Sequence, residues 1–330
     1  MRPVILTHFS YLVTGGAGFI GSNLCEALLG SGNKVVCLDN LATGRIQNID
    51  AFMQNPDFSF IRGDIRNMDD CKKAVQGVDV VLHQAALGSV PRSIKDPQST
   101  HEVNVNGFLN VLLAARDAGI KRFVYASSSS VYGDSAELPK TEEKIGKPLS
   151  PYAVSKTCNE LYANVFHKVY GMETIGLRYF NVFGKHQDPE GAYAAAIPKF
   201  IKALIQHESP LIHGDGSHSR DFTYVKNVVL MNQLAAATTN EEAFGQVFNT
   251  AVGERFNLNQ MLELIKTYLT KWDAKISQIE VKYGPERQGD IPHSLASIEK
   301  AKRVLGYQPA YLFEAGLKEA LDWYWENLQQ

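Results

Sequence analysis

Short apolar runs alternate with helical segments through the first 180 residues of the chain. The runs are rich in β-branched and aromatic residues, and they predict six strands, at residues 11–14, 35–38, 58–61, 78–82, 123–126 and 174–179. Helices are predicted between them, among others at residues 23–31, 106–118 and 153–170. Strict alternation of strand and helix favours an α/β fold, a doubly wound parallel sheet covered on both faces.

This alternation stops after residue 181. Pro189, Pro198 and Pro210, with the turn at 214–216, indicate loops around a helix near 199–206. A strand near 246–250 and helices at 258–269 and 313–327 follow. We therefore expect a larger domain over residues 1–180 and a smaller C-terminal α/β domain over 181–330. Some elements of about 215–255 should return to the sheet. Ligands of such folds bind at the carboxyl ends of the strands, so the smaller domain should close there.

Composition and charge narrow the class of protein. The chain has 330 residues, 45% hydrophobic and 21% charged, as in ordinary globular proteins. A net charge of −2 gives no reason to expect nucleic acid or a membrane surface as partner. The four cysteines, Cys25, Cys37, Cys71 and Cys158, are scattered without metal-binding spacing, so no metal is expected. With neither a signal-peptide pattern nor a long apolar run, a cytoplasmic location is expected.

A glycine-rich turn follows the first predicted strand and precedes a helix. Gly15, Gly18 and Gly21 have the spacing GxxGxxG, and Gly16 adds the overlapping GxGxxG. Glycines at these positions allow a tight turn, close approach of a pyrophosphate and close packing of helix on strand. The free N–H groups at the start of the helix would bind the phosphates. The motif in this context predicts a dinucleotide site.

Acidic residues at the ends of the next two strands select the dinucleotide. Asp39 ends the second strand, where its carboxylate can accept hydrogen bonds from the adenosine ribose. A carboxylate there repels a 2′-phosphate, which favours NAD over NADP. Asp64 and Ile65 follow the third strand, where a side chain could contact the adenine.

Tyr152 and Lys156 are four residues apart, on one face of the helix that begins after Pro151. A free phenol has a pKa near 10, too high for a base at neutral pH. A neighbouring ammonium and the positive nicotinamide would favour the phenolate, so Tyr152 becomes a usable base. The serine run at 127–130 ends the fifth strand, and a hydroxyl there could share the substrate's proton with Tyr152.

These motifs resemble the extended short-chain dehydrogenase/reductase family, and within it the UDP-N-acetylglucosamine 4-epimerases of bacterial surface-polysaccharide synthesis. The resemblance covers essentially the whole chain. It rests on TGGAGFIG, LDNLATG, GDIRN, HQAALGSVPRS, NVNGF, SSSSVYGD, PLSPYAVSK, GLRYFNVFG, SRDF and RQGDIPHS. It implies a Rossmann domain that binds NAD over residues 1–180 and a lid over 181–330 that binds a UDP-sugar.

By this resemblance Ser128, Tyr152 and Lys156 form a catalytic triad. Besides Tyr152 and Lys156, residues of the glycine turn and of the segments that follow the strands match cofactor contacts: Gly15, Gly18, Phe19, Ile20, Gly21, Asp39, Asn40, Thr43, Gly44, Asp64, Ile65, Gln84, Ala85, Ala86, Asn104 and Phe180. Residues that match those holding the UDP part are Arg220, Arg287 and Asp290.

Several reactions share this scaffold. Related dehydratases carry an Asp-Glu pair in the serine run, where this chain has Ser129 and Ser130. A dehydrogenase that oxidises in two steps would need a cysteine nucleophile motif, which is not evident, and a non-enzymatic NAD sensor would have lost the triad. Epimerisation needs only the triad and retained NAD: C4 is oxidised, the 4-keto sugar rotates, and hydride returns to its other face. The expected enzyme is an NAD-dependent UDP-sugar 4-epimerase.

The substrate is predicted from small side chains. Galactose epimerases carry a bulky Tyr where this chain has Ser294, and Asn where it has Ala195, so space is left for an N-acetyl group. Side chains that could bond the sugar, besides Ser128 and Tyr152, are Ser89, Ser129, Asn181 and Gln187. UDP-GlcNAc and UDP-GalNAc are therefore the expected pair. UDP-glucose/UDP-galactose and UDP-N-acetylglucosaminuronate remain alternatives, the last with Arg92 or Lys185 at C6.

A homodimer is also implied by the resemblance, because the family pairs two helices per subunit into a four-helix bundle. The helices here are roughly 99–118 and 153–170. Their outer apolar positions are expected to be Val105, Leu109, Leu113, Val165 and Val169.

Overall fold

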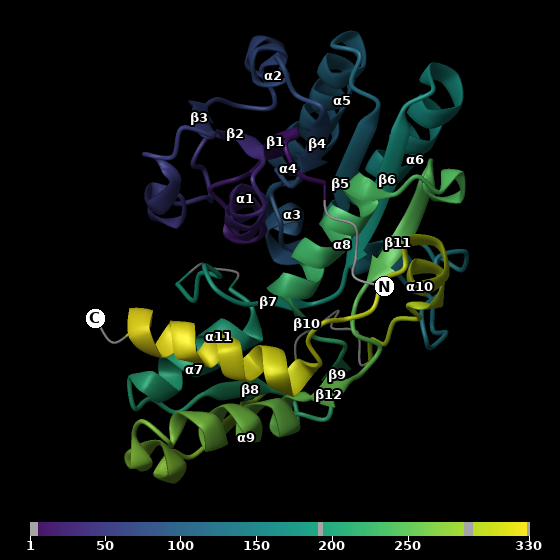
Figure 1. Ribbon diagram of the computed structural model, residues 1–330. Helices are drawn as coiled ribbons and strands as arrows, with labels where there is room; N and C mark the ends of the chain where they lie inside the picture. The colour runs from purple at the N-terminus through teal and green to yellow at the C-terminus, as the bar shows by residue number, and fades with distance from the viewer. Residues whose placement is uncertain (1–5, 191–193, 287–292, 329–330) are drawn as a thin grey trace.

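The computed structural model describes residues 6–190, 194–286 and 293–328 (Figure 1). Its centre, within those ranges, is a parallel sheet of seven strands in the order β11-β6-β5-β4-β1-β2-β3. In chain order they are β1 (Ser10–Thr14), β2 (Lys34–Asp39), β3 (Phe58–Arg62), β4 (Val80–His83), β5 (Arg122–Ser128), β6 (Glu173–Tyr179) and β11 (Gln246–Thr250). The six expected strands and the strand expected near 246–250 all lie in this sheet. The predicted doubly wound α/β fold is confirmed.

Helices cover both faces of the sheet, because its strands are apolar on both sides. One face buries side chains of α1 (Phe19–Gly30), α8 (Val225–Ala237) and α10 (Glu299–Leu305). The other buries side chains of α2 (Met68–Ala74), α5 (Phe108–Asp117) and α6 (Pro151–Tyr170). Helix α1 begins at Phe19, earlier than residue 23, because the extended Gly18 is already its N-cap.

The segment before α5 differs from the single helix expected over 99–118. It consists of α3 (Val90–Lys95), α4 (Pro97–His101) and a π-helical turn, η3 (Glu102–Gly107). A π-helical turn is wider than an α-helix, so the 3.6-residue spacing does not carry back from Leu109 to Val105. Val105 is consequently buried, at 6% exposure, and its predicted outer position is wrong.

A second group of elements lies below the sheet in Figure 1, with a core of its own. Its helices are α7 (Ala196–Ile205), α9 (Leu258–Leu269) and α11 (Phe313–Leu328). Short strand pairs join it: β7 (Val182–Phe183) with β10 (Thr223–Tyr224), β9 (Ser219–Arg220) with β12 (Phe256–Asn257), and β8 (Leu211–His213) with β13 (Lys282–Gly284). We therefore propose a domain division near residue 180, with α8, β11 and α10 returning to the sheet. None of the helices in the described ranges has both the length and the apolar character of a membrane span.

Candidate active site

A cavity of about 550 Å³ lies where β1 to β5 end. It is lined by side chains or main chain from the glycine turn, from the ends of β2, β3, β4 and β5, and from the start of α6. The predicted residues that line it are Gly15, Gly18, Phe19, Ile20, Gly21, Asp39, Asn40, Thr43, Asp64, Ile65, Gln84, Ala85, Ala86, Ser128, Tyr152 and Lys156. The fold thus brings the predicted cofactor and triad positions to one side of the sheet.

The glycine turn has a shape that larger residues could not adopt. Gly15 has φ +68°, in the left-handed region, and its N–H donates to the Leu38 carbonyl oxygen across 2.8 Å. A Cβ on Gly21 would lie 2.1 Å from the Gly15 oxygen. Helix α1 has no side-chain cap and no acidic residue in its first turn. Its first N–H groups therefore face the cavity ready for an anion, which fits the pyrophosphate of NAD.

The ribose end of the cavity is formed by Asp39. Its carboxylate accepts hydrogen bonds from the main-chain N–H of Ala17 at 3.0 Å and of Leu41 at 2.8 Å. Burial raises the pKa of this carboxyl, and the two hydrogen bonds oppose that rise. The carboxylate is thus fixed at the end of β2, where it suits ribose hydroxyls and disfavours a 2′-phosphate.

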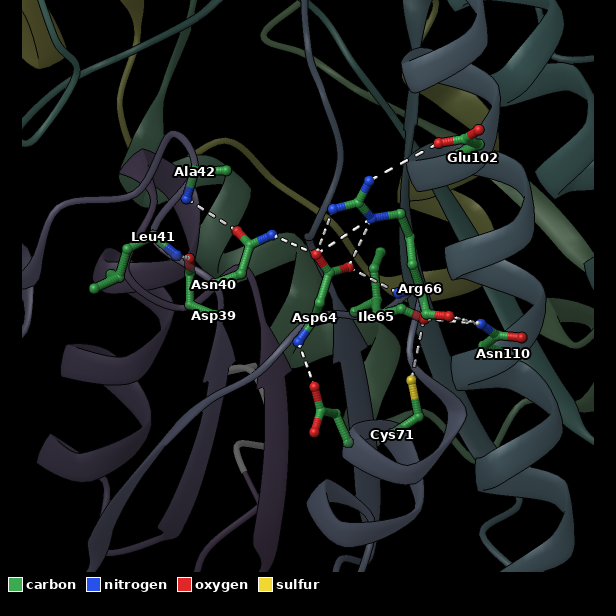
Figure 2. A network of polar contacts seen from close by, with 11 residues as sticks. Asp39, Asn40, Leu41, Ala42, Asp64, Ile65, Arg66, Cys71, Glu102 and Asn110 are labelled. Carbon is green, nitrogen blue, oxygen red and sulfur yellow. Dashed lines mark hydrogen bonds and ion pairs between the residues drawn. The ribbon is translucent and has the colours of Figure 1, made fainter.

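A polar network forms the next wall of the cavity (Figure 2). Arg66 donates to both oxygens of Asp64, the shortest contact being 2.7 Å from Nη2 to Oδ2. Asn40 Nδ2 donates to the same Oδ2 across 2.9 Å. The hydrogen bonds from Arg66, chiefly, lower the pKa of Asp64 to about 2. The carboxylate is therefore an anion with a fixed orientation. Arg66 also lines the cavity. It belongs to the motif GDIRN, but it was not among the predicted cofactor residues.

Helix α6 delivers two of the triad residues. Ser150 caps it by accepting from the Ala153 N–H across 3.1 Å, and Pro151 occupies its first turn. Tyr152 therefore stands at the start of the helix, and Lys156 follows one turn later on the same face. Ser128 is the last residue of β5, and its hydroxyl oxygen accepts from the Ser130 N–H across 3.1 Å.

Charge in the triad is set by burial and by two contacts. Burial raises the pKa of the Tyr152 phenol, and a hydrogen bond with Ser128 opposes the rise. Lys156 Nζ lies 6.0 Å from the centre of the Tyr152 ring. Burial lowers the pKa of Lys156 to about 8, against the opposing charge of Glu160. A pKa of about 8 keeps Lys156 mainly as the ammonium at neutral pH, near the ring of Tyr152.

Two hydrogen-bonded groups at the edge of the cavity were not predicted from the sequence, although Gln84 itself was; Gln84 and Tyr179 both line the cavity. Tyr179 donates to Gln84 Oε1 at 2.9 Å, and Asn232 donates to Tyr179 at 2.9 Å and accepts from Gln84 at 3.2 Å, which closes a triangle. His83 Nδ1 lies 2.9 Å from the Thr14 hydroxyl, which also accepts from the Ala85 N–H. Each contact needs residues from separate strands or helices, so no local pattern announces it.

Three predicted cofactor residues do not line the cavity. Gly44 lies beside it, since a Cβ there would be 3.0 Å from Asp39 Oδ2. Asn104 is buried, and it accepts from the Leu87 N–H and donates to the Leu87 oxygen. Phe180 is fully buried against the ring of Tyr132, so the structure does not bring its side chain to the cavity.

A second cavity, of about 270 Å³, adjoins the first, because Asn181 and Val182 line both. The predicted substrate residues Ala195 and Arg220 line it, together with Lys199 and Phe222 among others. Tyr152 and Asn181 line the same cavity, so the predicted triad and the residue shared by both cavities border one continuous space.

The other predicted substrate residues lie as follows. Ser89 caps α3, Ser129 begins the turn after β5, and Gln187 donates to the Val182 oxygen at 2.9 Å. Ser294 is half-buried, and its N–H donates across 3.0 Å to the oxygen of Ser219, the residue before Arg220. None of these four lines either cavity. Arg287 and Asp290 lie outside the described residues.

Asp221, which the sequence analysis did not single out, holds this region together. Its buried carboxylate accepts from the main-chain N–H groups of Val252, Gly253 and Ala296, at 3.1 to 3.2 Å. Burial raises the pKa of this carboxyl to about 6. The segment between Arg220 and Phe222, which line the second cavity, is thereby joined to the segments at 252–253 and 296.

Comparison with known proteins identifies the family. Residues 11–251 match the model of the NAD dependent epimerase/dehydratase family. The chain belongs to this family. The prediction of NAD as cofactor and the prediction of an NAD-dependent epimerase are thereby confirmed.

Individual relatives extend over nearly the whole chain. A UDP-glucose 4-epimerase of Mycolicibacterium smegmatis is 34% identical, over 95% of this chain and 97% of its own. The structure of UDP-N-acetylglucosamine 4-epimerase from Methanobrevibacter ruminantium M1 in complex with UDP-N-acetylmuramic acid is 39% identical, with a TM-score of 0.90 over 97% of this chain and 99% of that one. UDP-glucuronic acid 4-epimerase from Bacillus cereus, in complex with UDP-glucuronic acid and NAD, is 32% identical, with a TM-score of 0.85 over 95% and 98%.

Proposed function

We propose that this protein is a UDP-sugar 4-epimerase that interconverts UDP-GlcNAc and UDP-GalNAc. The observation that carries the proposal is that Ser128, Tyr152 and Lys156 line the cavity that fits NAD, and that this cavity shares Asn181 and Val182 with the second cavity. A sugar bound by its nucleotide in the second cavity would extend to Tyr152. The names of the relatives support a 4-epimerase, and they span three sugar classes.

Each triad residue has a role that its surroundings support. Bound NAD would accept a hydride from C4 of the sugar and return it. Tyr152 would take the proton of the C4 hydroxyl and give it back, and Ser128, which lowers the pKa of the Tyr152 phenol, would hydrogen-bond the same oxygen. The ammonium of Lys156, 6.0 Å from the centre of the Tyr152 ring, would favour the phenolate by its charge. The run Ser129-Ser130 supplies no carboxyl group near this point, as an elimination would require.

The preference for an N-acetylated sugar rests on small side chains. Ala195 lines the second cavity, and Ser294 is bonded to the strand that carries Arg220. We propose that Arg220, Arg287 and Asp290 hold the UDP part. Lys185, one of the two candidates for binding a uronate carboxylate, already pairs with Glu26 at 2.7 Å, which argues against Lys185 in that role.

A homodimer is part of this proposal. Leu161, Val165 and Val169 recur every four residues along α6, and each is exposed, at 63%, 49% and 65%. Leu109 and Leu113 of α5 are half-buried. A continuous apolar face of this kind on a helix is typical of a surface that another chain covers.

The test is an end-point assay without added cofactor. The purified protein is expected to contain NAD, released on denaturation, and to convert UDP-GlcNAc to UDP-GalNAc. UDP-glucose, UDP-glucuronate and UDP-N-acetylglucosaminuronate are assayed in parallel, with separation of the products. Strict dependence on added NAD with stoichiometric NADH release would indicate a dehydrogenase. Outright preference for UDP-glucose or for a uronate would contradict the N-acetyl assignment.

A further inference from the structure

We propose that Glu160 is a positioning residue of the active site: held by Arg178, its carboxylate fixes helix α6 to the end of strand β5, and so fixes Tyr152 and Lys156 relative to Ser128. The inference rests on the proposed epimerase function, which it deepens.

The Glu160 carboxylate joins three elements. It accepts from the Ser127 hydroxyl at 2.5 Å. It also accepts from Arg178 Nε at 2.9 Å and from Arg178 Nη2 at 2.8 Å, in a two-pronged ion pair. Ser127 lies on β5, Arg178 on β6 and Glu160 on α6, and Ser127 and Arg178 face each other in the sheet register.

The position of this contact ties it to catalysis. We call the contact of Glu160 with Ser127 and Arg178 the clamp. Because Ser127 directly precedes Ser128, the clamp holds the peptide next to the hydroxyl of the predicted triad. Glu160 follows Lys156 by four residues and Tyr152 by eight, on the same face of α6. Any shift or rotation of α6 that loosened the clamp would move the phenol and the ammonium away from Ser128.

The ion pair of the clamp is buried, which restricts its motion and carries a cost in desolvation free energy. The side chains of Arg178 and Glu160 are only 3% and 11% exposed. Arg178 also donates to the Glu142 oxygen at 2.9 Å and lies 4.9 Å from the ring centre of Tyr132. Replacing a buried ion pair by apolar residues is often neutral or stabilising, so stability alone gives little reason for this pair.

Glu160 also adds a negative charge near Lys156. The titratable groups that face Lys156 are His83 of β4, and Tyr152 and Glu160 of α6 itself. Burial and Lys156 lower the pKa of His83 to about 3, so His83 is neutral, whereas the charge of Glu160 raises the pKa of Lys156. Arg178, beyond Glu160, is positive. Loss of the Glu160 charge should therefore let Lys156 lose its proton at lower pH.

The test compares Glu160→Gln with Glu173→Gln in the full-length protein. Glu173 forms the matching pair with Arg122 at the opposite end of the same two strands, with 2.7 Å between Arg122 Nη2 and Glu173 Oε2. Glu160→Gln is expected to lower kcat by about ten- to a hundredfold with little change in KM or NAD content. The alkaline limb of its kcat profile should move down by about one pH unit. Glu173→Gln should lower stability only.

Two further variants keep the test decisive if Glu160→Gln does not fold. Ser127→Ala preserves the ion pair but cuts the bond to β5, so kcat should fall several-fold without a shift of the alkaline limb. Glu160→Asp retains the negative charge, so the alkaline limb of its kcat profile should stay at the pH of the wild type. The ionisation of Lys156, followed by NMR of its labelled side chain and assigned with Lys156→Arg, tests the charge effect without catalysis. If Ser127→Ala and Glu160→Gln behave like Glu173→Gln, the inference is wrong. If the wild type converts no UDP-sugar, the proposed function fails, and the NMR titration still decides whether Glu160 acts on Lys156.

Discussion

The ammonium of Lys156 donates a hydrogen bond to the main-chain oxygen of Ala126 across 2.8 Å. This contact joins α6 to β5 two residues before Ser128, and the Glu160 carboxylate joins the same elements one helical turn further on. Two of the triad residues come from the helix and one from the strand, so their mutual distances depend on these contacts. The site is therefore fixed by the packing of one helix on one strand end.

Removing the phenolic hydroxyl of Tyr152 should remove the proton acceptor. Tyr152→Phe is expected to lower kcat by about 10²- to 10⁴-fold, the usual contribution of a general base. NAD content should stay close to that of the wild type, because the glycine turn and Asp39 are untouched. Tyr162→Phe, at an exposed position on the same helix, is the control and should leave kcat unchanged. A folded Tyr152→Phe protein with near-normal turnover would contradict the role of Tyr152 as the general base.

Stability should depend on pH through His83. Burial chiefly lowers the pKa of His83 from 6.5 to about 3. Between these values the unfolded chain binds a proton there and the native protein does not. The contribution of His83 to the free energy of unfolding should therefore fall as the pH drops from 6.5 toward 3, by about 1.4 kcal/mol per unit.

His83→Asn removes this titration and keeps a polar group near Thr14. In urea denaturation at a series of pH values, the variant should be less stable than the wild type at pH 7. The difference between the two should narrow as the pH falls below 6.5. Parallel curves over this range would contradict the assignment of the effect to His83.

A charge on the exposed face of α6 should prevent dimer formation. Leu161→Glu would place a carboxylate in the row formed by Leu161, Val165 and Val169, where a partner chain would have to desolvate it. Light scattering at micromolar concentration should give the mass of a dimer for the wild type and of a monomer for the variant. Leu312→Glu is the matched control, because Leu312 is similarly exposed but lies before α11. A monomeric wild type would refute the dimer.

Local patterns predicted the strands and the glycine turn, because each depends on residues that are neighbours in sequence. Gly15, Gly18 and Gly21 are required by one turn, and the turn is encoded within eight residues. The burial of Val105 could not be predicted in this way. A π-helical turn changes the helical period there.

The supporting residues of the site were invisible for a different reason. Glu160 and Arg178 are 18 residues apart, and Tyr179 and Asn232 are 53 apart. Each pair is brought together by the packing of a helix on strand β6, which the sequence indicates only as a class of fold. A buried carboxylate such as Asp221 looks in sequence like any surface acid, because its three main-chain donors come from distant segments.

Substrate preference should respond to the size of residue 294. Ser294 is half-buried beside the strand that carries Arg220. The resemblance described above predicts that it occupies the position of a bulky aromatic of the galactose epimerases. Ser294→Tyr should occupy the space that an acetamido group needs, and overpacking of this kind costs about 1–3 kcal/mol when the walls cannot relax. The ratio of kcat/KM for UDP-GlcNAc over UDP-glucose should therefore fall by about ten- to a hundredfold. Activity on UDP-glucose should survive or rise, because the plain sugar needs less room.

A control substitution separates the loss of space at residue 294 from any general effect of an added tyrosine. Ser217→Tyr introduces the same side chain at an exposed turn before β9 and should leave the ratio unchanged. Both variants are compared with the wild type by initial rates on the two substrates, with NAD content measured in each preparation. An unchanged ratio in Ser294→Tyr would contradict the role of Ser294 in N-acetyl specificity. Such a result would leave the epimerase assignment itself intact, because Tyr152, Lys156 and Ser128 act on C4, whereas the acetamido group is carried by C2.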